Sequence, residues 1–374
     1  MTYTQTRGSS TGRADDHDAV DDVLRLLEPD GSRIADDTLD PWVADLSPHE
    51  LRALHRDMVL TRRLDAEGVA LQRQGQLALW APCRGQEATQ VGTAHALAPG
   101  DFVFPSYREH GVLLGRGAKP ADYVLAWRGE EHSAYDHTTI NAAPPQIIIG
   151  AQSLHATGWA MGAQRDGSTD VAVAYYGDGA TSQGDVNEAM VFASSFRAPV
   201  VFVCSNNQWA ISEPVTVQAT YPIAGRAPGF GIPSLRIDGN DALACVAAMR
   251  WALDRARRGE GPSFIEAVTY RMGPHTTSDD PTRYRDAAEV DEWAQRDPIA
   301  RLEAYLRAEG MLDDSGMDEV TRAADALAAE VRAACIGATT RAPETMFDHV
   351  YAEPHAAVER QKAEYMDYLA GFEK

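Results

Sequence analysis

The sequence has 374 residues, 44% of them hydrophobic and 24% charged, which is typical of a globular protein with a large core. Its formal net charge of −21 argues against nucleic acid or an anionic membrane as the main partner. No apolar run approaches the roughly 20 residues of a membrane-spanning helix, and the N-terminus lacks the apolar core of a secretory signal, so we expect a cytoplasmic protein.

Three regions follow one another along the chain. Residues 1–45 are polar and acidic, and we expect them to form a flexible N-terminal arm. Residues 46–340 are predicted to form the main domain, which begins with apolar residues at helical spacing in "LSPHELRALHRDMVLTRRLDAEGVALQRQ". Residues 341–374 are predicted to form a C-terminal helical extension, which follows a helix at 319–337.

Two short apolar stretches, Val171–Tyr176 and Pro199–Ser205, predict strands that are buried on both faces, because they are rich in valine and show no alternation. The stretch between them, 181–198, has the apolar spacing of a helix. A strand, a helix and a strand in about 35 residues form a βαβ unit of a parallel sheet. Further strands and an intervening helix are expected at 234–239, 263–272 and 241–259, which completes a wide α/β sheet flanked by helices.

Polar residues follow these two strands. Gly177-Asp178-Gly179 ends the first strand and Asn207 follows the second, so both should lie at the carboxyl edge of the sheet, where ligands bind. A helix start attracts anions, and a carboxylate there would compete with a phosphate unless a cation lay between them. Carboxylate and amide oxygens suit Mg²⁺, whose remaining positions phosphate oxygens can fill. The sequence therefore predicts Mg²⁺ between Asp178, Asn207 and a diphosphate at the glycine turn.

The motif "GDG", then 26 residues, then "NN" resembles the thiamine diphosphate fold motif. Four stretches resemble the α subunit of the decarboxylating component of 2-oxo acid dehydrogenase complexes: "FVFPSYREHGVLLGRG", "PQIIIGAQSLHATGWAMG", "GDGATSQGDVNEAMVFASSFRAPVVFVCSNNQWAIS" and "TYRMGPHTTSDDPTRYR". The resemblance runs from about Leu51 to Arg285 and more weakly to the end. It implies a thiamine-diphosphate-binding α/β fold with a mostly parallel sheet and with helical extensions at both ends.

The resemblance also implies the cofactor ligands. Asp178 and Asn207, with the backbone carbonyl of Trp209, would bind Mg²⁺. The diphosphate would lie against Gly177, Gly179 and Ala180, and the last two would offer backbone N–H groups.

A separate loop and a run of isoleucines complete the implied cofactor site. Tyr107 and Arg108 would reach the diphosphate, since the arginine fork of donors matches phosphate oxygens. Backbone groups of Ile147 and Ile149 would hold the aminopyrimidine ring, and the Ile149 side chain would press the cofactor into its bent shape. Mammalian branched-chain relatives carry an arginine where this chain has Ser205, so phosphate neutralisation would depend more on Arg108 and the metal.

His275, in "GPHTTSDD", is the implied catalytic residue. It would face the thiazolium side and handle protons or the incoming lipoyl group, for which a side chain with a pKa near working pH is suited. The alternative is a structural histidine in a loop. Residues 276–285 are rich in Thr, Ser, Asp and Pro and predict a mobile loop that closes over the channel, in which Thr276 and Ser278 occupy positions that are phosphorylated in some relatives.

The chain is expected to be half of an active site. In the heterotetrameric branch of the family, the glutamate that protonates the aminopyrimidine ring belongs to a separate β subunit, and this chain lacks room for the second domain of single-chain relatives. The expected partners are that β subunit, in an α₂β₂ heterotetramer, and a lipoyl-bearing acyltransferase. The expected reaction is oxidative decarboxylation of a 2-oxo acid on thiamine diphosphate, with reductive acylation of the lipoyl group.

The substrate is predicted from three stretches. Residues 226–241 and 347–371 resemble branched-chain α subunits more than animal pyruvate ones. Leu79 and Trp80, in "GQLALWAPC", are predicted to line the acyl pocket, where each buried CH₂ of a branched substrate is worth roughly 0.8 kcal/mol. Branched-chain 2-oxo acids are therefore favoured over pyruvate. Acetoin cleavage and a non-catalytic phosphate-binding module are further alternatives.

Overall fold

The protein is described by a computed structural model that covers residues 22–129 and 135–372. Its centre is a five-stranded sheet in the order β1-β2-β3-β7-β6, in which every neighbouring pair is parallel. The strands are β1 (Phe102–Phe104), β2 (Ala172–Gly177), β3 (Val200–Asn206), β6 (Ser234–Asp238) and β7 (Ser263–Val268). Strands β2, β3 and β7 have neighbours on both sides and are almost entirely buried, which explains their unbroken apolar runs and confirms the predicted parallel sheet.

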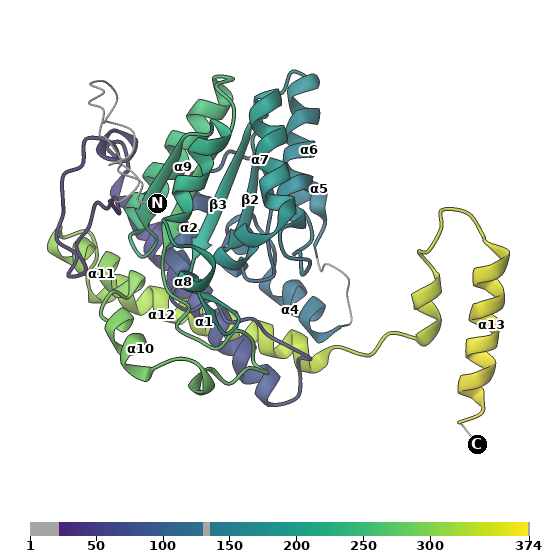
Figure 1. Cartoon of the computed structure of the whole chain (residues 1–374). Coiled ribbons are helices and arrows are strands. Elements are labelled where there is room, and N and C mark those ends of the chain that lie inside the picture. Colours follow the sequence, from purple (N-terminus) through teal and green to yellow (C-terminus); the bar gives the residue numbers. More distant parts are fainter. Residues whose placement is uncertain (1–21, 130–134, 373–374) are drawn as a thin grey trace, which may run out of the picture.

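Helices cover both faces of the sheet (Figure 1). Because neighbouring strand residues point to opposite faces, Tyr176 packs beneath α6 and α7, whereas Tyr175 belongs to the core beneath α1 and α9. Helix α2 lies against both α1 and α9. These helices are α1 (Pro48–Arg73), α2 (Glu87–His95), α6 (Ala151–Arg165), α7 (Gly184–Phe196) and α9 (Ala242–Arg257).

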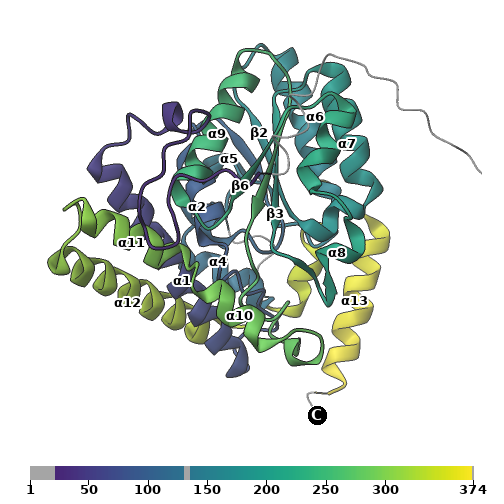
Figure 2. The same ribbon diagram turned by 60° about the vertical axis from the view of Figure 1, so that its left-hand side comes forward.

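Helix α1 begins at a capping box. The Ser47 side chain accepts a hydrogen bond from the Glu50 backbone at 3.3 Å, and the Glu50 carboxylate accepts one from the Ser47 backbone at 2.8 Å. Pro48 occupies the first helical position, where no N–H is needed. Figure 2 shows α11 and α12 beside α1, away from α6 and α7.

The remaining elements are short or lie at the periphery of the sheet. The helices are α3 (His110–Gly115), α4 (Pro120–Arg128), α5 (His137–Ile140), α8 (Val215–Gln218), α10 (Ala287–Ala294), α11 (Pro298–Ala308), α12 (Asp314–Gly337) and α13 (Ala356–Ala370). The 3₁₀ turns are η2 (Asp40–Trp42), η3 (Asp178–Ser182), η4 (Ile223–Phe230), η5 (Pro281–Arg283) and η6 (Pro343–Phe347), and β4 (Trp209–Ala210) and β5 (Glu213–Pro214) form a small antiparallel pair. Among the described residues, no helix is both long and apolar enough to cross a membrane.

The described part of the predicted N-terminal arm is packed on the core. Leu24 pairs with Ile237 of the edge strand β6, and Leu26, Leu27 and Leu39 are fully buried. An edge strand carries unpaired backbone groups that another segment can satisfy, and this segment also supplies buried leucines. The prediction of a flexible arm is therefore wrong for residues 22–45, and residues 1–21 lie outside the described part.

The C-terminal segment after α12 stands apart from the body of the molecule (Figure 1). Its helix α13 has no buried residue, and it packs mainly on η6. Large apolar side chains remain exposed there, namely Met346, Val350, Tyr351, Tyr368 and Phe372. The helical character expected of residues 341–374 is present in α13, and the domain boundaries themselves stay predictions.

Candidate active site

The residues that follow β2 and β3 meet at the carboxyl edge of the sheet. Gly177, the last residue of β2, lies in register with Ser205 of β3. The chain leaves the sheet at Asp178 and Asn207, and the Asn207 backbone donates a hydrogen bond to Asp178 Oδ1 at 3.3 Å. The βαβ geometry thus places the two residues together, as predicted.

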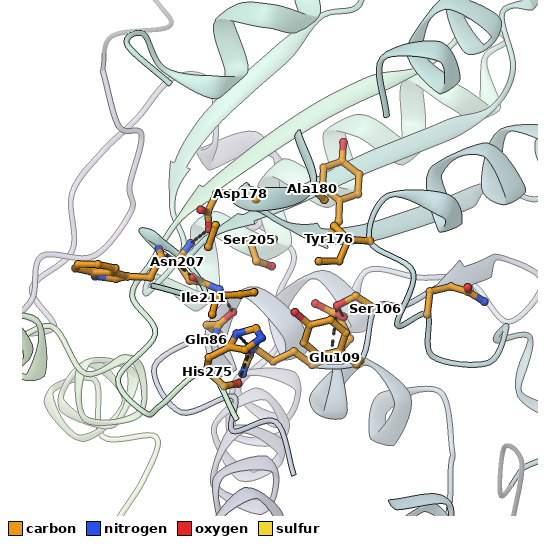
Figure 3. A pocket seen from close by; sticks show the side chains of 18 of the residues that line it. Gln86, Ser106, Glu109, Tyr176, Asp178, Ala180, Ser205, Asn207, Ile211 and His275 are labelled. Atoms are coloured by element: carbon orange, nitrogen blue, oxygen red, sulfur yellow. Dashed lines mark hydrogen bonds between the residues drawn. The ribbon is translucent and has the colours of Figure 1, made fainter. Parts of the chain in front are cut away.

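A cavity of about 150 Å³ lies at this edge, with Asp178, Asn207 and His275 facing it (Figure 3). All the predicted cofactor contacts except Ile147 line it: Tyr107, Arg108, Ile149, Gly177, Asp178, Gly179, Ala180, Asn207, Trp209 and His275. The other lining residues were not predicted: Gln86, Ser106, Glu109, Gln146, Gln152, Tyr176, Gln183, Ser205, Ala210 and Ile211.

Three predicted residues lie elsewhere. Ile147 is 77% exposed and lies outside the cavity wall. Trp80 is fully buried and its indole N–H donates to Asp65 at 2.8 Å, so the prediction that its side chain lines an acyl pocket is wrong. Leu79 is half-buried and does not line the cavity, and its role in an acyl pocket stays a prediction.

The surroundings of Asp178 fit a hard cation. The side chain is almost fully buried, and burial raises its pKa to about 6. A buried carboxylate needs compensating partners, and its Oδ2 has one in the Gln218 side-chain amide at 3.0 Å. The amide oxygen of Asn207 and the backbone carbonyl of Trp209 belong to residues of the same cavity wall. Carboxylate, amide and carbonyl oxygens form a donor set that suits Mg²⁺.

The glycine turn leaves room only for a glycine at position 179. A Cβ atom added to Gly179 would lie 2.8 Å from Cβ of Ala210, closer than such atoms approach. The absence of a side chain therefore lets this turn pack directly on Ala210, a residue of the cavity wall.

Buried polar atoms in the cavity wall lack partners. Gln86 Nε2 and Ser205 Oγ have no hydrogen-bond partner within the described part of the chain, although both residues line the cavity. Since buried polar groups are normally hydrogen-bonded, a polar ligand or water is expected there. Gln86 also accepts from the Asn207 side-chain amide at 3.3 Å. The sequence indicates a role for Gln86 only through its position just before α2, a helix that is buried although it contains several polar residues.

Arg108 and His275 are joined across the cavity. Arg108 Nη2 lies 3.2 Å from His275 Nδ1 and donates to the His275 carbonyl at 2.9 Å, while Nη1 donates to the Pro82 carbonyl at 2.6 Å. Burial, with the positive charges of Arg108 and Arg271, lowers the pKa of His275 to about 4. The imidazole is therefore neutral near pH 7, and because Nδ1 accepts from arginine, its proton is on Nε2.

The loop after His275 is fastened by hydrogen bonds. Asp279 accepts from the His275 backbone at 2.7 Å and from the Tyr284 hydroxyl. Arg285 donates to backbone carbonyls of residues 271–273. Ser278 is exposed and Thr276 is half-buried. The mobility of this loop and the phosphorylation of Thr276 and Ser278 stay predictions.

A parallel sheet with a buried acid, an amide, an arginine and a neutral histidine around one cavity is the arrangement of an α/β enzyme. A family model described as "Dehydrogenase E1 component" matches residues 55–350, and the chain belongs to this family. This membership confirms the resemblance that the motifs indicated.

Three relatives illustrate the similarity. "3-methyl-2-oxobutanoate dehydrogenase subunit alpha" of Mycobacterium tuberculosis (strain CDC 1551 / Oshkosh) is 49% identical over 348 residues, which cover 93% of this chain and 94% of the relative. "Pyruvate dehydrogenase E1 component subunit alpha" of Acholeplasma laidlawii is 41% identical over 333 residues, 87% of this chain and 95% of the relative. The protein of the same name from Staphylococcus epidermidis (strain ATCC 35984 / DSM 28319 / BCRC 17069 / CCUG 31568 / BM 3577 / RP62A) is 40% identical over 337 residues, 89% of each chain.

Proposed function

We propose that this chain is the α subunit of a thiamine-diphosphate-dependent 2-oxo acid dehydrogenase that acts on branched-chain 2-oxo acids in the cytoplasm. The observation that carries the proposal is the meeting of Asp178 and Asn207, joined at 3.3 Å, in one cavity with Arg108 and His275. A phosphate-binding module without catalysis would explain the glycine turn but not this combination.

The residues of the cavity fit the proposed cofactor. Asp178, Asn207 and the carbonyl of Trp209 would hold Mg²⁺, and the turn at Gly179 would admit the diphosphate. Gln86 Nε2 and Ser205 Oγ, both buried without partners in the described residues, are free to donate to anionic oxygens. Thiamine diphosphate, when bound, supplies the electron sink for loss of CO₂.

The side chains of this subunit would position the reacting groups and donate a hydrogen bond to them. Arg108 fixes His275 through Nδ1 and the backbone carbonyl, which leaves the protonated Nε2 to donate a hydrogen bond. Since Arg108 occupies Nδ1 and the proton is on Nε2, His275 would act as a hydrogen-bond donor to the reacting atoms. The Tyr107 ring, 6.0 Å from the His275 ring centroid, limits the orientations of the imidazole.

A second chain is proposed to complete the site. Ligand pockets commonly enclose about 300–1,000 Å³, whereas this cavity encloses about 150 Å³. Apolar side chains stand exposed beside it, with Ile147 at 77% and Ile148 at 72%. Exposed apolar side chains next to an incomplete cavity support a β subunit, in an α₂β₂ assembly, as their cover. A lipoyl-bearing acyltransferase is the proposed acceptor of the acyl group.

The choice of substrate rests on the relatives. The 49% identity to a protein named 3-methyl-2-oxobutanoate dehydrogenase favours branched-chain acids. The alternative is pyruvate, since the relatives at 41% and 40% identity are named pyruvate dehydrogenase subunits. Acetoin cleavage is a third alternative, which the substrate spectrum also tests.

The proposal is tested by decarboxylation with an artificial electron acceptor. The chain is assayed with and without its candidate β subunit, in thiamine diphosphate and Mg²⁺, on pyruvate, 3-methyl-2-oxobutanoate and 4-methyl-2-oxopentanoate. Activity that needs both chains and favours the branched acids is the expected result. A preference for pyruvate would reverse the substrate and keep the mechanism, while turnover by this chain alone would contradict the shared site.

A further inference from the structure

A buried carboxylate lies behind the wall of the active site. Asp65, in the middle of α1, is 3% exposed and does not line the cavity. Its Oδ1 accepts from Trp80 Nε1 at 2.8 Å and from the Cys83 backbone at 3.0 Å, and its Oδ2 accepts from the Arg84 backbone at 3.0 Å. One side chain of α1 thereby fixes both ends of the segment from Trp80 to Arg84.

The other side of this segment contacts the active site. The Pro82 carbonyl accepts from Arg108 Nη1 at 2.6 Å, and this is one of the bonds that orient the guanidinium. The Thr277 backbone N–H donates to the Trp80 carbonyl at 2.9 Å, and the Trp80 backbone N–H donates to the Thr277 hydroxyl at 3.1 Å. Thr277 lies two residues after His275. The segment is therefore held between Asp65 on one side and the Arg108 and His275 groups on the other.

The same surroundings argue against a metal at Asp65. Ligand atoms of Asp65, Cys83 and His110 all lie within 4.8 Å of one another, as in some metal sites. However, both Asp65 oxygens already accept hydrogen bonds, and the His110 nitrogens are 2.8 Å from the Tyr123 hydroxyl and 2.8 Å from the Ala81 carbonyl. The oxygens of Asp65 and the nitrogens of His110 are thus already used by other groups of the protein, which makes this a hydrogen-bonded support.

We infer that Asp65 is a positioning residue of the active site, which holds the segment from Trp80 to Arg84 so that Pro82 orients Arg108 and Trp80 anchors the loop of His275. The inference rests on the proposed function, because the roles of Arg108 and His275 come from it. A carboxylate suits the task because charged acceptors form the stronger hydrogen bonds and can accept several donors at once.

Asp241 provides a matched control. It is also fully buried, and its carboxylate accepts backbone N–H groups at the start of α9 and in the N-terminal segment, from Leu26, Leu27, Leu243 and Ala244. Asp241 does not line the cavity. The substitutions Asp65→Asn and Asp241→Asn each replace an acceptor oxygen by a donor, so both destabilise the protein, but only the first should disturb the site.

The first experiment is amide hydrogen exchange on the full-length chain without cofactor. We expect Asp65→Asn to accelerate exchange about tenfold in peptides that contain Cys83, Arg84 and Thr277, since a lost buried bond to a charged group favours local opening. Asp241→Asn should accelerate exchange at Leu26 and Leu27 instead. Unchanged exchange at Thr277 in folded Asp65→Asn protein would overturn the inference. If that variant does not fold, Trp80→Phe removes one donor to Asp65 and should accelerate the same peptides.

The second experiment uses the chain assembled with its β subunit, thiamine diphosphate and Mg²⁺. We expect Asp65→Asn to raise the cofactor concentration for half-maximal activity about tenfold and to lower kcat, as the loss of an outer hydrogen bond does at comparable sites. Asp241→Asn should lower only the Tm. Equal effects of the two substitutions on cofactor affinity would reduce Asp65 to a purely structural role. Absence of cofactor binding by the native assembly would reject the proposed function instead. The hydrogen-exchange experiment would still show whether Asp65 holds the segment from Trp80 to Arg84 and the loop of His275 in place.

Discussion

The guanidinium of Arg271 donates to the carbonyl oxygen of Trp209 at 3.0 Å, the oxygen proposed as a magnesium ligand. The same fully buried side chain donates to the Tyr284 hydroxyl at 2.8 Å. Since Tyr284 contacts Asp279, and Asp279 accepts from the His275 backbone, Arg271 joins the loop after β3 to the loop of His275.

Replacement of Arg271 by lysine should loosen both loops, because one ammonium cannot reach Trp209 and Tyr284 together. We expect the Mg²⁺ concentration for half-maximal activity to rise about tenfold and the free energy of unfolding to fall by about 2 kcal/mol. A metal titration of activity and a denaturant titration measure the two effects. Arg255→Lys serves as the control, since Arg255 is a half-buried arginine of α9 that pairs with Glu260 away from the cavity. An unchanged metal requirement in folded Arg271→Lys protein would contradict the link.

Asp178→Asn should abolish the dependence of cofactor binding on Mg²⁺. The substitution keeps the shape of the side chain but removes the charge that a hard cation requires. We expect activity to fall at least about a hundredfold, as for the loss of a metal ligand that acts with its neighbours. Calorimetric titration of thiamine diphosphate with and without Mg²⁺ provides the measurement. The exposed Asp166, at the end of α6, gives the control Asp166→Asn, which should bind as the native protein does. Retained metal dependence in Asp178→Asn would remove this residue from the metal site.

The sheet and the meeting of Asp178 with Asn207 could be predicted because they follow from local patterns. Buried parallel strands read as apolar runs, and their carboxyl ends must share an edge. The roles of Asp65 and Arg271 could not be predicted, because each acts through contacts far along the chain: Arg271 bonds Trp209, 62 positions away. The spacing of apolar residues along the chain does not indicate contacts between positions so far apart.

The errors have a similar physical origin. The polar composition of residues 1–45 suggested an arm, yet a few leucines and the open edge of β6 were sufficient to dock residues 22–45. Trp80 lies in the stretch expected to form the acyl pocket, and its backbone does contact the His275 loop. Its indole is turned inward, where the N–H donates to the buried carboxylate of Asp65. Side-chain direction depends on such partners and is not visible in the sequence.

The neutral state of His275 predicts a pH dependence of stability. Its pKa in the folded protein is about 4, below the unfolded value of about 6.5. The stability associated with the neutral ring is therefore present above pH 6.5 and lost as the pH falls through 4. Because the His275 side chain is partly exposed, solvent screening reduces this effect, and we expect the free energy of unfolding to fall by about 1 kcal/mol between pH 7.5 and pH 5. The measurement is denaturant unfolding of native and His275→Gln protein at both values. The loss should be smaller in the variant, and equal losses would show that His275 does not titrate as described.

Gly179→Ala should close the turn where the diphosphate is proposed to bind. The added Cβ would lie 2.8 Å from Cβ of Ala210, so the turn must shift, and we expect cofactor affinity to fall at least about tenfold. Gly184, the first residue of α7, provides the control, because a Cβ added there meets nothing within 4 Å. The Gly184→Ala protein should therefore bind the cofactor as the native protein does. The double substitution Gly179→Ala with Ala210→Gly removes the clash and should recover most of the affinity. Failure of this rescue would mean that the contact with Ala210 is not the cause of the lost affinity.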